Sequence, residues 1–491
     1  MKTSRPFGRP RNPISILHSL LAIAVFGAAL TGCGSGSHMA SPPPVGNTKA
    51  VLLLTSTAND QLVRFDTSIS TIALTDSTGK STTIFTGANQ SGTQVEWMHL
   101  DGASEPLPTV SVPQGTYVAA TVTVVDCDFT NVTFVNQSIT TSIFGEDLCG
   151  QGTGTTTVNF PNPITVAGSA MALSLDLQVA QSFTLTSTAF PAVYTISPTF
   201  NLTPVTIAAQ PTDETNGKVI GVAGQVTSLN ANADRFAAQT PDGFLLTLAT
   251  NANTTFQGIA AFSSLSTNQL VNFDAAIQSD GSLLATRVEV DDATSTAAII
   301  GFFGFPQPQS VFATINLQLD GCSISGTPFC GVVYQFNDDT VFNISQQLPN
   351  VASLPFPATF GGANFLLGQY LSVFTPGTFT QNYQNVSTIT LEPQTLNGTV
   401  TAVSNDAGFT VYTVTLAPYD LFPVLQMDPD FGSPQLTNPT TVFVYADTNA
   451  KLLNAGGTVN VGSLLRFRGL VFDDNGTMRM DCSEIYDGVT E

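Results

Sequence analysis

The chain has 491 residues, of which 42% are hydrophobic and 10% are charged, and its formal net charge is −21. This apolar content can fill several buried cores, which excludes a disordered chain. The acidic balance excludes nucleic-acid binding, because phosphate backbones would be repelled.

The first predicted element is an export signal that covers residues 1–32. Four basic residues between positions 2 and 11 precede an apolar run from Ile14 to Leu30, which is the order of a signal peptide. The run is shorter than the about 20 apolar residues that a membrane-spanning helix needs. The sequence Leu-Thr-Gly-Cys at positions 30–33 resembles the bacterial lipobox. That resemblance implies cleavage before Cys33 and acylation of its thiol.

Acylation would anchor the chain in the bacterial cell envelope. The residue after Cys33 is Gly34 rather than the aspartate of an inner-membrane retention signal, so the resemblance implies the outer membrane. The alternative is an ordinary signal peptide with an incidental cysteine. Residues 33–48 are rich in Gly, Ser and Pro and predict a flexible tether.

Residues 49–206 are predicted to form a β-sandwich. Apolar and polar residues alternate over Thr116–Val125, and Gly, Pro and Asn clusters separate such runs. The segment Val112–Tyr117 has the pattern V-P-x-G-x-Y and resembles the turn of prealbumin-like domains, the transthyretin or CnaB-like sandwiches. Leu175–Leu177 fits the same pattern. A similar domain of unknown function opens many bacterial surface lipoproteins, so the resemblance implies a fold and no activity.

The remaining chain is predicted to hold two or three small β-barrels in tandem, at residues 218–293, 298–393 and 394–491. The first and last segments share a G-x-V opening, at Gly224–Val226 and Gly398–Val400, and a closing Asp-Gly or Asn-Gly hairpin. These units resemble a second family of unknown function with OB-like barrels. The middle unit lacks the G-x-V opening, so its membership stays open. Its run Phe302–Phe305 is expected in a strand and the core.

Five cysteines remain once Cys33 is lipidated. Export permits disulfides. Cys127 and Cys149 fall in one predicted domain, and Cys322 and Cys330 fall in one predicted hairpin, so we expect these two pairs. Metal binding by these cysteines would need clustered spacing, which is absent. The remaining Cys482 is expected to be buried and inert.

Catalytic residues are scarce. Only His38 and His99 follow the signal peptide. A catalytic triad or a histidine-based metal site would therefore depend almost entirely on His99. No nucleophile elbow or phosphate-binding glycine loop is present. We therefore expect no enzymatic activity and no cofactor.

Two acidic turns offer hard oxygen ligands for Ca²⁺. They contain Asp428 with Asp430 and Asp473 with Asp474. Neither matches the twelve-residue calcium loop, and ordinary turn chemistry explains the same residues. Calcium therefore remains the alternative to a hairpin turn at both places.

The sequence favours an all-β, membrane-anchored, extracytoplasmic protein that acts as a non-enzymatic interaction or structural module. The first alternative is a lipoprotein that binds a polysaccharide or a divalent cation. The second is an enzyme of unrecognised type, which would require a concave cluster of acids with shifted pKa values. The sequence does not identify the protein or polysaccharide partner.

Overall fold

Almost every element of the protein is a β-strand, as the predicted all-β class requires. The exceptions are four 3-10 turns and two short helices among the described residues, α1 (Val179–Ser182) and α2 (Leu421–Gln426). None of the helices that the structure describes is long and apolar enough to cross a membrane. The computed structural model describes residues 46–57, 62–88, 92–135, 138–144, 154–187, 193–295, 297–307, 315–323, 332–336, 339–348, 351–376, 384–418, 420–426, 436–453 and 457–489.

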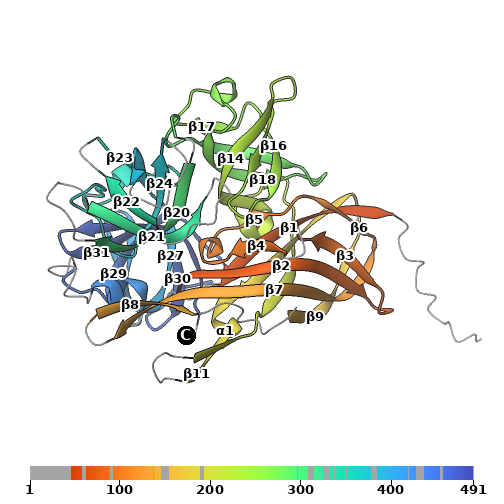
Figure 1. Ribbon diagram of the computed structural model, residues 1–491, viewed down its shortest axis with the longest axis horizontal. Coiled ribbons are helices and arrows are strands. Elements are labelled where there is room, and N and C mark those ends of the chain that lie inside the picture. Colours follow the sequence, from red (N-terminus) through yellow and green to blue (C-terminus); the bar gives the residue numbers. More distant parts are fainter. Residues whose placement is uncertain are drawn as a thin grey trace, which may run out of the picture. The chain divides into compact units, whose positions relative to one another are not determined.

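Two β-sheets and a hairpin make up the N-terminal region (Figure 1). The first sheet has the order β13-β10-β1-β5, with β6 also paired to β1. Its strands are β1 (Asn47–Thr57), β5 (Glu105–Pro106), β6 (Val110–Pro113), β10 (Ala170–Gln178) and β13 (Phe200–Val205). The second sheet has the order β3-β2-β7-β8, with β4 on β2 and β9 on β7. Its strands are β2 (Leu62–Asp76), β3 (Ser81–Thr86), β4 (Thr93–Glu96), β7 (Gly115–Val135), β8 (Ser138–Phe144) and β9 (Gly154–Val166), and the hairpin is β11 (Phe183–Ser187) with β12 (Val193–Ile196).

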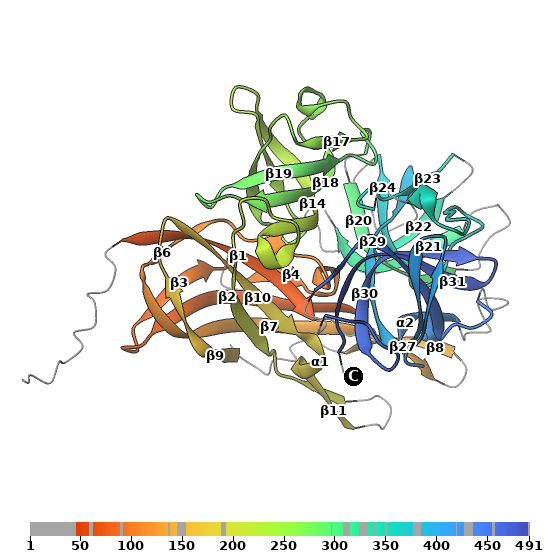
Figure 2. The ribbon, with the colours of Figure 1, turned by 180° about the vertical axis from the view of Figure 1, so that it is seen from behind.

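These two sheets share one hydrophobic core. Leu54 on β1 and Leu175 on β10 belong to the same buried cluster as Ile72 on β2 and Val122 on β7. The alternation of apolar and polar residues produces this, because alternate side chains of a strand point to opposite faces. Figure 2 shows β1 and β10 side by side, and they pair in parallel.

The V-P-x-G-x-Y segment has a clear structural role at the step from β6 to β7. Tyr117 is buried, and its hydroxyl donates a hydrogen bond to the carbonyl oxygen of Pro113 over 2.9 Å. The aromatic ring thereby joins the core while its polar end fixes the turn.

The segments predicted as the first and last small barrels share one strand order. In the first, β16-β15-β14-β18-β19 are neighbours and β16 also pairs in parallel with β19. In the last, β27-β28-β29-β31-β30 form a closed barrel in which β29 pairs in parallel with β31. The first has β14 (Lys218–Asn230), β15 (Arg235–Gln239), β16 (Leu245–Ala249), β17 (Thr255–Gln257), β18 (Leu270–Ile277) and β19 (Leu283–Glu289); the last has β27 (Gln394–Asp406), β28 (Phe409–Thr415), β29 (Thr441–Leu452), β30 (Leu464–Asp474) and β31 (Thr477–Asp487).

The shared G-x-V opening marks a β-bulge. The register of β14 shifts directly after Val226 and that of β27 directly after Val400, and both valines are fully buried. A Cβ atom on Gly398 would lie 2.5 Å from Cγ1 of Val414, and one on Gly224 would lie 3.2 Å from a carbonyl oxygen. A side chain at Gly398 would therefore force a shift of the neighbouring strand, and Gly224 lies at a close but less restrictive approach.

The middle segment forms a sheet with the order β23-β26-β24-β20-β21-β22-β25. Its path β22-β21-β20-β24-β26 matches the antiparallel path β16-β15-β14-β18-β19 of the first unit, and β23 pairs in parallel with β26 as β17 does with β19. Its strands are β20 (Ala297–Gln307), β21 (Ile315–Ser323), β22 (Val332–Phe336), β23 (Val341–Ile344), β24 (Tyr370–Thr375), β25 (Gln384–Asn385) and β26 (Thr388–Leu391).

Residues 44–491 form one compact unit, so the domain boundaries predicted inside it stay predictions. Cys482 is buried with a free thiol, as expected, and burial raises the pKa of that thiol. Cys127 is buried and disulfide-bonded. Its predicted partner Cys149 lies outside the described residues, as do Cys330 and the side chain of Cys322. The two pairings therefore stay predictions.

Candidate functional site

A row of polar side chains crosses three neighbouring strands of the first N-terminal sheet. Thr55 on β1 lies opposite Asp176 on β10, and Asp176 lies opposite Asn201 on β13. The flanking residues Leu175 and Leu177 point into the core. The period of two that buries these leucines turns Asp176 to the other face of the sheet.

Asp176 is held in place by neighbouring side chains. The hydroxyls of Thr55 and Thr57 donate hydrogen bonds to its two carboxylate oxygens over 3.0 and 3.1 Å, and the amide of Gln178 donates another. Burial raises the pKa of Asp176, while the hydrogen bonds from Thr55 and Thr57 and the charge of Arg466 lower it in part. The carboxyl group is thus a fixed part of the polar face.

The last barrel supplies the wall opposite this polar face. Arg466 on β30 and Tyr486 on β31 are register partners, and the guanidinium carbon lies 5.3 Å from the centre of the tyrosine ring. Arg466 also forms an ion pair with Asp101 and donates from Nε to the carbonyl oxygen of Asp487 over 2.9 Å. These contacts fix the arginine.

A single 3-10 turn, η2 (Glu214–Asn216), completes the walls. Asp213 caps it, and Gly217 follows at a φ of 95°, a backbone conformation that favours glycine. Burial and the neighbouring carboxylate of Glu484 raise the pKa of Glu214 to about 8. The Tyr486 hydroxyl donates towards Glu484 over 2.7 Å and lies 3.3 Å from Glu214.

Together these elements surround a cavity of about 480 Å³. This is the size of a site for a small ligand. We call it the polar cleft, and its polar lining includes Thr57, Asp176, Asn201, Glu214, Arg466 and Tyr486.

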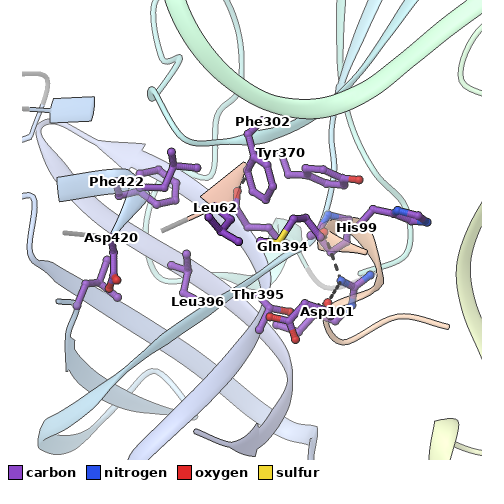
Figure 3. Close-up of a pocket in the computed structure, with 15 residues that line it drawn as sticks. Leu62, His99, Asp101, Phe302, Tyr370, Gln394, Thr395, Leu396, Asp420 and Phe422 are labelled. Carbon is purple, nitrogen blue, oxygen red and sulfur yellow. Dashed lines mark hydrogen bonds between the residues drawn. The ribbon is translucent and has the colours of Figure 1, made fainter. Parts of the chain in front are cut away.

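A second, more apolar cavity holds only about 30 Å³ (Figure 3). That volume suits about one or two water molecules rather than a ligand. Phe302 and Tyr370 line it with ring centres 4.9 Å apart. Arg468 donates to the carbonyl oxygens of Asp101 and Pro393, and Thr395 donates to that of Asp101 over 2.9 Å. The contacts around this cavity therefore serve packing.

A third polar site contains Glu96, His99, Glu105 and Asp242, which we call the His99 cluster. His99 lies on η1 (Met98–Leu100), between β4 and β5. Its Nδ1 is 3.2 Å from Oε2 of Glu96, and its Nε2 is 3.4 Å from Oε2 of Glu105. Asp242, in the connection between β15 and β16, accepts a hydrogen bond from the backbone of Glu96 over 3.2 Å.

The titration of the His99 cluster reflects its burial and its charges. Burial disfavours a charge on His99, but the hydrogen bonds to Glu105 and Glu96 outweigh burial and raise its pKa well above the usual value. Burial and the Glu105 carboxylate raise the pKa of Asp242. Burial also opposes ionisation of Glu96, yet His99 and backbone donors bring its pKa below the usual value.

None of the predicted site residues whose side chains the structure describes lines the polar cleft or belongs to the His99 cluster. Cys33, Asp428 and Asp430 lie outside the described residues. Asp473 accepts a hydrogen bond from the backbone of Gly476 over 2.7 Å, and Asp474 pairs with Arg479 over 2.7 Å. These contacts are those expected from a hairpin turn and its neighbouring strand, so calcium at Asp473 and Asp474 stays an untested alternative.

The sequence reasoning missed the polar cleft and the His99 cluster. It treated His99 as isolated, whereas Glu96 and Glu105 from the same stretch of chain and Asp242 from a distant turn surround it. Two signals were available: the alternation in β10, which turns Asp176 outward, and the short spacing of Glu96, His99 and Glu105.

Comparison with known families finds a match within the first small unit. Residues 223–289 match a family described as a domain of unknown function, DUF5666. The match begins within β14 and ends with the last residue of β19, so it spans the strands of the first small unit. The prediction that this segment resembles a family of unknown function is thus confirmed for this unit. No curated protein matches the chain.

Proposed function

We propose that the protein is a bacterial lipoprotein, attached to the cell envelope through Cys33, that acts by binding rather than by catalysis. The basic start, the apolar run and the lipobox-like ending at residues 30–33 support the anchor. The outer membrane is the proposed location because Gly34 follows the cysteine.

The proposed ligand is a short stretch of an uncharged, hydroxyl-rich polysaccharide, bound in the polar cleft. The observation that carries this is a cavity of about 480 Å³ whose lining mixes hydroxyl, amide and carboxyl groups with one arginine, which is ion-paired to Asp101, and one tyrosine. Such groups donate and accept hydrogen bonds, as sugar hydroxyls do. The acidic balance of the chain disfavours an anionic ligand.

The topology of the last barrel supports the same ligand class. Its strand order, with a parallel pair between the third and fifth strands, resembles an OB-like barrel. Barrels of that kind often bind oligosaccharides or oligonucleotides, although a fold alone does not decide a function.

One observation favours an enzyme as the second candidate. Glu214 has a pKa of about 8 and therefore carries a proton at neutral pH, as a general acid of a glycosidase does. Asp176 lines the same cleft but already accepts three hydrogen bonds from side chains. We therefore favour binding over hydrolysis.

Calorimetric titration of the purified protein with a panel of neutral oligosaccharides tests the proposal. Asn201→Ala removes an exposed amide from the cleft and should weaken binding by up to about tenfold, the value of one neutral hydrogen bond. The matched control is Asn230→Ala, an exposed asparagine at the end of β14, which should leave affinity unchanged. Equal affinities in both variants, or the absence of any binding, would contradict the cleft as the site. Release of shorter sugars during the titration would favour the enzyme instead.

A further inference from the structure

The side chain of His99 is oriented by a fixed carboxylate. Glu96 accepts hydrogen bonds from the backbone nitrogens of Phe65 and Met98 at Oε1, both over 3.0 Å, and from the backbone of His99 at Oε2 over 3.1 Å. The same Oε2 atom faces Nδ1 of His99 over 3.2 Å. A carboxylate on one ring nitrogen sets the tautomer and leaves the other nitrogen as a metal ligand, which is the usual arrangement around metal-binding histidines.

Two buried carboxylate oxygens of the His99 cluster have no hydrogen-bond partner among the described residues. Glu105 is 2% exposed, and among the described residues none donates a hydrogen bond to its Oε1. Oδ2 of Asp242 is likewise buried and without a donor. A buried carboxylate oxygen without a partner is costly, so each of these atoms calls for a cation or a proton that protein donors do not supply.

The distances suit a shared ion. One ligand atom from each of His99, Glu105 and Asp242 lies within 4.8 Å of the others, and Nε2 of His99 is 3.4 Å from Oε2 of Glu105. Ligands about 2.0–2.2 Å from a tetrahedral metal lie about 3.3–3.6 Å apart, so the His99–Glu105 pair already matches one edge of such a site. The adjacent cavity of about 30 Å³, bordered by His99 and Glu105, has room for a water as fourth ligand.

The charges of the His99 cluster also favour a bound cation. The cluster brings three carboxyl groups around one imidazole, and no described lysine or arginine forms an ion pair with Glu105 or Asp242. A divalent cation would balance the buried carboxylates directly. A set of one imidazole and two carboxylates suits first-row divalent cations such as Zn²⁺ better than Ca²⁺, which takes six to eight oxygens.

We propose that Nε2 of His99 and the carboxylates of Glu105 and Asp242 bind one Zn²⁺-like divalent cation, with Glu96 as the positioning residue. The ion would connect the η1–β5 segment of the N-terminal region to the turn between β15 and β16 in the segment that matches DUF5666. This site is independent of the polar cleft and of its proposed ligand.

The test is titration of the chelator-treated purified protein with ZnCl₂, followed by calorimetry and by the melting temperature. We expect one Zn²⁺ per chain and a higher melting temperature in the loaded protein. Asp242→Asn keeps the acceptor for the Glu96 backbone but weakens the ligand, so it should lower Zn²⁺ affinity by at least about tenfold. The matched control, Asp234→Asn, changes an exposed aspartate at a φ of 46°, where asparagine is equally tolerated.

Glu96→Gln tests whether Glu96 positions His99 for metal binding or only stabilises the local fold. It should weaken Zn²⁺ binding by about 10- to 100-fold and change the ¹⁵N shift of Nδ1, with the His99 signal assigned by its loss in His99→Gln. Unchanged Zn²⁺ affinity in Asp242→Asn, or no Zn²⁺ binding by the folded wild type, would overturn the site. The cluster would then be a buried imidazolium that bridges two carboxylates.

Discussion

The first and last small units share a strand order and a bulged opening strand, yet a buried charge network lies where the first meets the middle segment and a large apolar cluster lies where the last meets it. In the first unit, Arg287 on β19 is buried between Asp274 and Glu289, and Glu289 accepts a hydrogen bond from the backbone of Gln346 in the middle segment over 2.9 Å. In the last unit, Phe472 on β30 belongs to one apolar cluster with Leu371 of the middle segment.

The difference shows which features the repeated pattern encodes. Gly224 and Gly398, with the valines that follow, fix the bulge and the strand order in both units. The residues that contact the middle segment lie outside that pattern and are free to differ. The contact of the first unit with the middle segment, the charged joint, therefore adds paired charges to a small apolar cluster around Leu270 and Phe374. The contact of the last unit, the apolar joint, adds hydrogen bonds such as that from Gln369 to Val471 to a larger apolar cluster.

The largest expected effect on stability is at the charged joint, between the first unit and the middle segment. Arg287→Met would leave Asp274 and Glu289 buried without their main cation, and loss of one partner from a buried pair costs about 3–5 kcal/mol. Urea denaturation should show this loss in the free energy of unfolding. Arg235→Met, at an exposed position of β15, is the control and should change stability by less than about 0.5 kcal/mol. A cost below about 1 kcal/mol at Arg287 would refute the contrast between the joints.

The next effect is a pH dependence at the same joint. Burial and the nearby Glu289 carboxylate raise the pKa of Glu392 from 4.5 to about 7. A carboxyl group with a raised pKa binds its proton more tightly in the folded state, so stability falls as the pH rises from about 4.5 to about 7.

Glu392→Gln should remove the part of this loss of stability that comes from ionisation of Glu392. The free energy of unfolding of the variant should rise relative to that of the wild type between about pH 4.5 and pH 7. Above pH 7 the difference should stay constant, at about 3 kcal/mol at most. Unfolding free energies measured from pH 4 to 8 check this. Parallel curves for the two proteins would show that Glu392 does not titrate as its surroundings suggest.

The smallest effect is expected at the apolar joint. Phe472→Leu keeps an apolar side chain in a fully buried position but leaves a small cavity, and such a change should cost about 1–2 kcal/mol. The same denaturation assay measures it. A loss as large as that of Arg287→Met would mean that the shape of the apolar joint matters as much as the charges of the other.

Sequence patterns predicted those features of the fold that depend on neighbouring residues. The Asn-Gly turn after β30 has φ values of 51° at Asn475 and 81° at Gly476, as its hairpin role requires. The expected burial of Cys482 is also confirmed. Each of these features depends on residues close together in the chain.

The candidate sites depend on residues that are far apart. Glu96 and Asp242, which meet in the His99 cluster, are 146 residues apart, and Asp101 and Arg466 beside the polar cleft are 365 apart. No spacing rule links such residues, because their meeting depends on how the sheets pack. Glu96 and Glu105 lie three and six residues from His99 and were readable in the sequence, but the third carboxylate, Asp242, reaches the cluster only through the fold.

The parallel pairing of β1 with β10 has a consequence for the order in which the chain can fold. Thr57 and Gln178 become neighbours across 121 residues, so one edge of β1 lacks its partner strand until a long stretch has been synthesised. Such non-local pairing is slow, and an open strand edge invites aggregation. We expect the nascent N-terminal region to need a holding chaperone until β10 arrives, whichever compartment it folds in.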